Sequence, residues 1–259
     1  MPERRPLRVV HTSDVHLGAY ASSNDEKWEA RRALMEEAFA NVITLANDVE
    51  ADALLICGDF FDNDRVSDAV VEYAGSEIAR FKGETVIVPG NHDPMDEGRV
   101  YWRYSLEAMA PRLRIFRSHA GEVFEIPELQ LVLWGRAFLE SDWHFRPLEG
   151  IPARLDKRWH IAMAHGHFVR ADGDHGRSLL IHQHEIEAIA GQWDYLALGH
   201  WEPHADVSHG GMTAVYSGAP LALSDSNTKS GWANVVDFGP GGVSWKRHRV
   251  DPRGEAPYS

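Results

Sequence analysis

The N-terminal third of the chain alternates between short, continuous apolar runs and longer segments in which apolar residues recur at helical spacing. The runs at Leu7–Ser13, Ala53–Cys57 and Thr85–Pro89 predict buried strands. The segments at Glu26–Val49 and Ser67–Phe81 predict amphipathic helices between them. This β-α-β-α-β order is typical of a parallel sheet, in which ligands bind beyond the carboxyl ends of the strands.

Beyond Tyr101 the apolar runs become shorter, and helical spacing returns only near Trp102–Ala110 and His184–Ala190. We therefore predict two sheets packed face to face with helices on the outside. No linker or repeat divides the chain, so residues 1–259 are expected to form one domain with frayed tails at 1–6 and 251–259. The later predicted strands are Val123–Ile126, Leu129–Trp134, Trp159–Ala164, Tyr195–Leu198, Thr213–Tyr216, Ala233–Asp237 and Val243–Arg249.

The composition favours a protein of a reducing compartment. Cys57 is the only cysteine, so an internal disulfide is excluded and stability has to come from packing. The apolar run Leu7–Val10 is too short for a signal sequence or a membrane span. We expect a soluble, cytoplasmic protein without a membrane partner.

Charge and histidine content bear on the substrate. A formal net charge of -13 argues against a chain that wraps nucleic acid with a broad basic face. It does not exclude DNA, because bound divalent cations would place positive charge where a phosphate sits. The chain also contains 15 histidines, which raises the expectation of a metal site.

Potential metal ligands follow each of the first three predicted strands. Asp14-Val15-His16 follows the first, Gly58-Asp59-Phe60-Phe61-Asp62 the second and Gly90-Asn91-His92-Asp93 the third. In extended chain, residues two apart point to the same side, so Asp14 and His16 can face one ion. Taken alone, each motif is more often a capped turn, and for Asp62 we favour a turn or helix-capping role.

Two later strands deliver histidines in the same way, His165 after Ile161–Ala164 and His200 after Tyr195–Gly199. A single histidine at a strand end is usually structural. Five strand ends that all carry ligand-type residues make a shared metal site the better interpretation.

These motifs, in this order, resemble the calcineurin-like metallophosphoesterase family, and the likeness runs from about Leu7 to Asp237. Three segments are most similar to its DNA repair exonuclease branch, the SbcD-type nucleases: His11–Gly18, Asp194–His200 and Val215–Pro220. The resemblance implies an α/β fold of the four-layer αββα type, with two mixed β-sheets flanked by helices. It also implies two divalent metal ions, with manganese the expected metal and iron or zinc the alternatives.

The family pattern assigns the ligands residue by residue. Asp59 would bridge both ions, and the first ion would also bind Asp14 and His16. The second ion would bind Asn91, His165 and His200. A bridged pair of ions about 4 Å apart acidifies a shared water and clamps the attacking and leaving oxygens of an in-line displacement. The expected nucleophile is therefore a metal-activated hydroxide.

The resemblance also implies two catalytic residues that bind no metal. His92 would lie over the substrate, stabilising the phosphoryl charge or protonating the leaving oxygen. Asp93 would orient the His92 ring.

The last family motif is altered. Gly-His-x-His reads Gly199-His200-Trp201-Glu202 here, followed by Pro203-His204. Either Glu202 supplies an oxygen, which favours manganese or magnesium at the first position, or His204 restores the nitrogen ligand. His167, two residues past His165, is a further candidate that we interpret as structural.

The motifs leave several functions open. The leading hypothesis is a phosphodiesterase acting on DNA ends or a small phosphodiester, with an ATPase partner as a further implication of the resemblance. A phosphomonoesterase or a protein phosphatase would use the same two-metal site. A hypothesis from another class is a metal-binding interaction protein that has lost turnover, which the altered last motif motivates.

Overall fold

The structure is a computed structural model that describes residues 4–20, 25–154, 156–170, 178–224, 227 and 229–254. A six-stranded sheet forms one half, in the order β14-β13-β1-β2-β3-β4, with β1 to β4 parallel and β13 and β14 antiparallel. Its strands are β1 (Leu7–Thr12), β2 (Ala53–Cys57), β3 (Glu84–Val88), β4 (Leu113–Ile115), β13 (Trp232–Gly239) and β14 (Gly242–Arg249).

A second six-stranded mixed sheet has the order β11-β12-β10-β7-β6-β5. Its strands are β5 (Glu122–Ile126), β6 (Leu131–Gly135), β7 (Trp159–His165), β10 (Tyr195–Gly199), β11 (Ala205–Asp206) and β12 (Ala214–Tyr216). A separate pair joins β8 (His167–Val169) to β9 (Leu180–His182).

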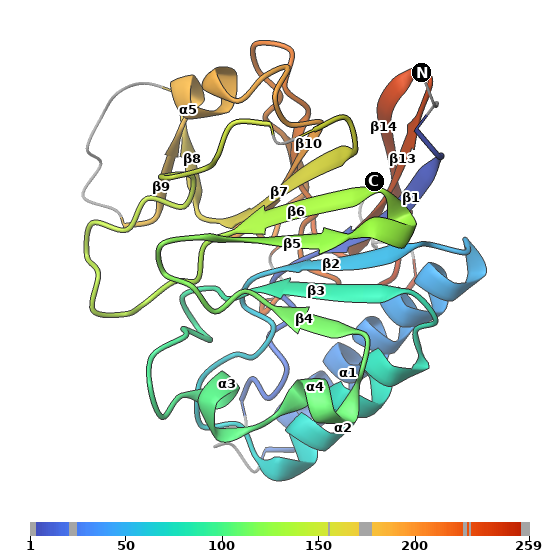
Figure 1. Cartoon of the computed structure of the whole chain (residues 1–259). Helices are drawn as coiled ribbons and strands as arrows, with labels where there is room; N and C mark the ends of the chain where they lie inside the picture. Colours follow the sequence, from blue (N-terminus) through green and yellow to red (C-terminus); the bar gives the residue numbers. More distant parts are fainter. Residues whose placement is uncertain are drawn as a thin grey trace.

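The helices lie outside the two sheets (Figure 1). The long helices α1 (Glu26–Asp48) and α2 (Asp68–Arg80) cover the first sheet, with the short α3 (Val100–Arg103) and α4 (Leu106–Met109) beside them. The helix α5 (Gln183–Ala188) lies on the other side of the molecule near β8 and β9. The predicted fold class, two mixed β-sheets with flanking helices, is confirmed. No helix in the described ranges is long and apolar enough to cross a membrane.

Three apolar clusters fill the spaces between these layers. Phe39 and Val42 of α1 pack with Leu54 and Ile56 under the first sheet. Alternate residues of the same strand, such as Leu55, pack against Met163 of β7 between the two sheets. A third cluster, which includes Ile186 of α5, covers the outer face of the second sheet. Because the central strands are buried on both faces, they read as continuous apolar runs in the sequence.

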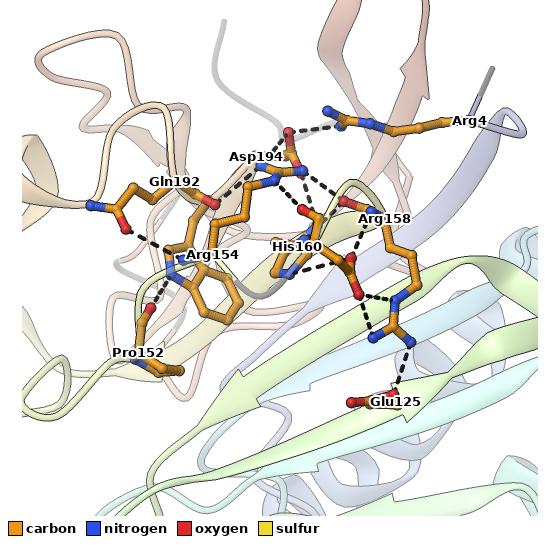
Figure 2. Close-up of polar contacts among 10 residues, drawn as sticks. Arg4, Glu125, Pro152, Arg154, Arg158, His160, Gln192 and Asp194 are labelled. Carbon is orange, nitrogen blue, oxygen red and sulfur yellow. Dashed lines mark hydrogen bonds and ion pairs between the residues drawn. The ribbon is translucent and has the colours of Figure 1, made fainter. Parts of the chain in front are cut away.

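A polar network fixes the end of the second sheet that lies opposite the carboxyl ends of β7 and β10 (Figure 2). Asp194, just before β10, accepts hydrogen bonds from Arg4 Nη1 at 3.0 Å, Arg154 Nη2 at 3.0 Å and the backbone amide of His160 at 2.8 Å. Nearby, the guanidinium group of Arg158 pairs with Asp156 and Glu125. The network ties the chain before β1 to the second sheet.

Several local predictions were wrong. The single segment Trp102–Ala110 is two short helices, and four strands of two or three residues (β4, β8, β9 and β11) were not predicted. The expected frayed tails are partly ordered: Arg4 and Arg5 bond to the body of the chain, and Asp251 is buried with Arg249 and Arg253 as partners. The remaining tail residues, 1–3 and 255–259, lie outside the described residues.

Candidate metal centre

The carboxyl ends of five strands from both sheets meet at one edge of the molecule. Asp14 and His16 follow β1, Asp59 follows β2, Asn91 follows β3, and His200 follows β10, while His165 is the last residue of β7. The loops after β1 and β2 run side by side, because Asp14 N donates to Gly58 O at 3.0 Å and His16 N to Asp59 O at 3.0 Å. The parallel strands therefore place these side chains together without a long connecting loop.

The backbone at this edge is strained. Asp14 and His16 both have φ 53°, Asp59 has φ 50° and His200 has φ 104°. Left-handed φ values are uncommon for residues other than glycine, and each costs about 1–3 kcal/mol unless the surroundings impose it. Four of the converging residues carry this strain, as is common for residues of functional sites.

Four side chains converge on one point, which we call the second position. Asn91 Oδ1 lies 3.0 Å from His165 Nε2 and 3.1 Å from His200 Nδ1, and these two ring nitrogens are 3.3 Å apart. Asp59 Oδ2 lies 3.3 Å from His165 Nε2. The Nδ1 atom of His165 faces the carbonyl oxygen of Cys57 at 2.9 Å, which leaves Nε2 as the nitrogen directed at the cluster.

A neighbouring set forms what we call the first position. Asp14, His16 and Asp59 offer ligand atoms that all lie within 4.8 Å of one another, and all three side chains are buried. Asp59 belongs to both sets. The carboxylate oxygens of Asp14 also accept the backbone N–H of His200, at 3.0 and 3.1 Å, which couples the two positions.

Asp62 lies in a bend, in keeping with the expected turn role, but it also contacts side chains of the site. Its carboxylate Oδ1 lies 3.3 Å from His16 Nδ1, and its backbone carbonyl accepts a 2.7 Å hydrogen bond from His92 Nδ1. His16, Asp62 and His92 form a third set of potential metal ligands. The signal for Asp62 in the sequence was its place as the last residue of the motif Gly58-Asp59-Phe60-Phe61-Asp62.

Asp93 does not orient the His92 ring as expected. Its buried carboxylate accepts hydrogen bonds from the backbone amides of Gly90, Asp59, Phe60 and Phe61, at 2.8 to 3.1 Å. The Tyr101 hydroxyl donates a further bond of 2.6 Å. Asp93 therefore binds the loops after β2 and β3 to each other, and Asp62 orients the His92 ring instead.

The sequence profile described as calcineurin-like phosphoesterase matches residues 7–202, which include every side chain of the first and second positions. The chain belongs to the calcineurin-like phosphoesterase family. The enzymes of this family are metal-dependent hydrolases of phosphoric esters, and they typically bind two divalent metal ions.

Solved structures agree with this phosphoesterase fold. The crystal structure of TT1561 of Thermus thermophilus is 14% identical, with a TM-score of 0.56, and the alignment covers 95% of this chain and 100% of that chain. Another crystal structure gives the same TM-score and coverage at 13% identity. These likenesses show the fold alone. No curated protein matches the chain.

The charges of this phosphoesterase site suit bound cations. Burial alone would lower the pKa of His16 and His165, but the carboxylates around them, chiefly Asp62 for His16 and Asp59 for His165, raise both pKa values to about 9. In turn, His165 and His16 outweigh the effect of burial and lower the pKa of the Asp59 carboxyl. The carboxylates therefore favour positive charge at His16 and His165, and divalent cations at the two positions would displace these two protons.

Glu202 and His204, the two candidate ligands from the altered last motif, both lie outside the first and second positions. The Glu202 carboxylate accepts hydrogen bonds from Leu223 N at 2.7 Å and Asn227 Nδ2 at 2.9 Å. The half-buried His204 ring packs against Trp245, with ring centroids 4.9 Å apart. Neither residue occurs in a potential ligand group of the described residues, so neither expectation for the first position is supported.

His167 lies beside the second position. Its ring centroid is 6.0 Å from that of His200, and its Nδ1 accepts a 2.9 Å hydrogen bond from Trp201 Nε1. This bond occupies one ring nitrogen, in keeping with the structural interpretation.

Proposed function

We propose that this chain is a phosphodiesterase with a dinuclear metal site. In this proposal Asp14, His16 and Asp59 hold one divalent ion, and Asp59, Asn91, His165 and His200 hold the other. The observation that carries the proposal is the convergence at the second position, where acceptor atoms of four side chains approach to 3.0–3.3 Å. Acceptors gathered this closely are compatible with a cation between them.

The ions would supply Lewis-acid polarisation of the phosphoryl oxygens and acidify an attacking water. Manganese is the proposed metal, because carboxylate and amide oxygens accompany the histidines in both positions.

His92 is the proposed catalytic residue of the protein itself. Its backbone amide donates to Asp59 Oδ1 at 2.8 Å, and its ring Nδ1 donates to the Asp62 carbonyl at 2.7 Å. The first bond holds the backbone of His92 and the second holds its ring, while the side chain stays 40% exposed, compared with 4% for His16. The other ring nitrogen, Nε2, would stabilise charge on the phosphoryl oxygens or donate a proton to the leaving oxygen. Asp93 would act indirectly, by positioning the loops that carry Asp59 and His92.

We propose a phosphodiester substrate, with DNA ends as one source and small phosphodiesters as the other. The support is the likeness of His11–Gly18, Asp194–His200 and Val215–Pro220 to SbcD-type exonucleases. The net charge of -13 favours short substrates that contact the metal site over long duplexes wrapped by the protein surface. An ATPase partner and a cytoplasmic location stay predictions.

The test compares hydrolysis of bis-p-nitrophenyl phosphate with that of p-nitrophenyl phosphate, using metal-stripped protein supplied with Mn²⁺. We expect faster cleavage of the diester. The His92→Ala variant should keep its bound metal and lose about 10²- to 10⁴-fold in kcat. His248→Ala, on the edge strand β14, is the matched control and should retain full activity.

Two results would contradict the proposal. Preferential cleavage of the monoester would make the protein a phosphomonoesterase. Metal binding without hydrolysis of either ester, under Mn²⁺, Fe²⁺ or Zn²⁺, would support the non-catalytic interaction protein. End-labelled single-stranded and duplex DNA, compared under the same conditions, then distinguish an exonuclease from an enzyme of small diesters.

A further inference from the structure

Glu202 follows His200 by two residues, yet its side chain is engaged elsewhere. One carboxylate oxygen accepts the backbone amide of Leu223 at 2.7 Å, and the other accepts Asn227 Nδ2 at 2.9 Å. The Glu202 carbonyl also accepts the amide of Ala219 at 2.8 Å. All three bonds go to the segment that follows β12, so Glu202 fastens that segment to the end of β10.

The fastened segment is itself part of the folded body. The Tyr20 hydroxyl donates to the Leu223 carbonyl at 2.5 Å, and the guanidinium group of Arg31 on α1 donates to the Ala222 carbonyl. Leu221 is buried against Met35. Moving the Glu202 carboxylate towards a metal would break two hydrogen bonds to a charged group, which are stronger than bonds between neutral groups, and would loosen this packing.

The two metal positions are consequently unequal in protein ligands. The second position gathers four side chains, from Asp59, Asn91, His165 and His200. Among the residues that the structure describes, the group at the first position has three, from Asp14, His16 and Asp59, and it shares Asp59 with the second; Asp62 lies beside this group, 3.3 Å from His16 Nδ1. Both Asp14 oxygens already accept the His200 amide, which reduces what that carboxylate offers to an ion.

We infer that the two positions bind metal with different affinities: the second retains its ion, whereas the first exchanges its ion with the solution because Glu202 is committed to Ala219, Leu223 and Asn227. This inference rests on the proposed dinuclear site. Ligand number and charge set the affinity of such sites, and the missing ligand should separate the two dissociation constants by at least about tenfold.

The experiment titrates metal-free, full-length protein with Mn²⁺ and measures free Mn²⁺ by electron paramagnetic resonance. We expect one tight and one weak ion per chain. Asn91→Ala should abolish binding of the tight Mn²⁺ ion. Asp14→Asn should abolish binding of the weak Mn²⁺ ion and leave the tight ion bound. Glu202→Gln, which retains an acceptor for Leu223, should leave both classes unchanged, with circular dichroism confirming that each variant is folded.

Two ions bound with equal affinity in the wild-type protein would overturn the inference, and this result does not depend on any variant. Loss of the weak class in Glu202→Gln would also overturn it, because Glu202 would then act as a ligand. If the protein binds one Mn²⁺ ion tightly and one weakly but cleaves no ester, the inference holds and the proposed function fails. Absence of any Mn²⁺ binding would overturn both.

Discussion

The hydroxyl group of Tyr101 donates a 2.6 Å hydrogen bond to the buried carboxylate of Asp93. Asp93 also accepts four backbone amides from the loops after β2 and β3. Burial, together with the nearby charge of Asp59, raises the pKa of Asp93 to about 6. One carboxylate thus joins the loop that bears Asp59 to the loop that bears Asn91.

We expect Asp93→Ala to lower the free energy of unfolding by about 3–5 kcal/mol, because four buried amides lose their acceptor. It should also abolish tight Mn²⁺ binding, since Asp59 and Asn91 would no longer be held together. Tyr101→Phe is the milder control, expected to lose about 1.5–3 kcal/mol and to keep its metal. Urea denaturation and elemental analysis measure both effects. Normal metal content in Asp93→Ala would show that the loops hold their positions without it.

The contact between the two sheets at Gly199 should be equally sensitive. A Cβ atom at this position would lie 1.7 Å from the carbonyl oxygen of Cys57 and 2.8 Å from Ser13 Cβ. Gly199→Ala should therefore force β10 away from β2, lowering stability by about 3 kcal/mol or more and displacing the adjacent His200. Gly241→Ala is the matched control, because an added Cβ would meet nothing within 4 Å. Its melting temperature and metal content should equal those of the wild type, and equal values for Gly199→Ala would contradict the expectation.

His11 should make stability depend on pH. This side chain is completely buried between the sheets, where its Nδ1 lies 2.9 Å from the Tyr195 hydroxyl. Burial lowers the pKa of His11 from 6.5 to about 3. The unfolded chain therefore takes up a proton at His11 from pH 6.5 downwards, whereas the folded chain does not. The contribution of neutral His11 to the free energy of unfolding is consequently complete above pH 6.5 and falls as the pH drops towards 3.

His11→Gln removes this titration. Relative to the variant, the wild type should lose about 2 kcal/mol of unfolding free energy between pH 7 and pH 5. Urea denaturation of both proteins at the two pH values, in the absence of metal, measures the difference. If the free energy of unfolding changes equally with pH in both proteins, His11 has the same protonation in the folded and the unfolded chain, which contradicts the expectation.

The network around Asp194 should affect stability alone. Asp194→Ala leaves Arg4, Arg154 and the His160 amide without their shared acceptor, which should cost about 2–3 kcal/mol. Mn²⁺ affinity should stay unchanged, because this residue lies at the end of β10 opposite His200. Asp237→Ala removes an ion pair with Arg8 whose side chains are 50% and 45% exposed, so it should cost less than about 1 kcal/mol. If Asp194→Ala and Asp237→Ala lower the free energy of unfolding equally, the Asp194 network contributes no more than an exposed ion pair.

The sequence predicted the central strands well, because strands buried on both faces have continuous apolar runs and end at polar residues. Ala53–Cys57 was predicted to the residue. The short strands β4, β8 and β9 were missed, because three residues carry no measurable periodicity and depend on neighbours that are far away in the chain.

Within the site, strand ends identified the side chains that converge, but not what each of them contacts. The carbonyl of Asp62, and not the carboxylate of Asp93, contacts the His92 ring, because loop packing decides which oxygen reaches it. The orientation of Glu202 depends on Leu223 and Asn227, more than twenty residues further along the chain. Such contacts between distant loops leave no signal at the motif itself.

The left-handed backbone at Asp14, His16, Asp59 and His200 sets stability against the proposed metal binding. Glycine at any of these positions would relieve roughly 1 kcal/mol of strain and, at Asp14 or Asp59, remove a buried charge. It would also remove a proposed metal ligand. Variants selected for heat resistance alone, without metal, would therefore drift towards inactive sequences at these four positions. Thermostable forms of this enzyme are better sought by changing residues at the opposite end of the sheets.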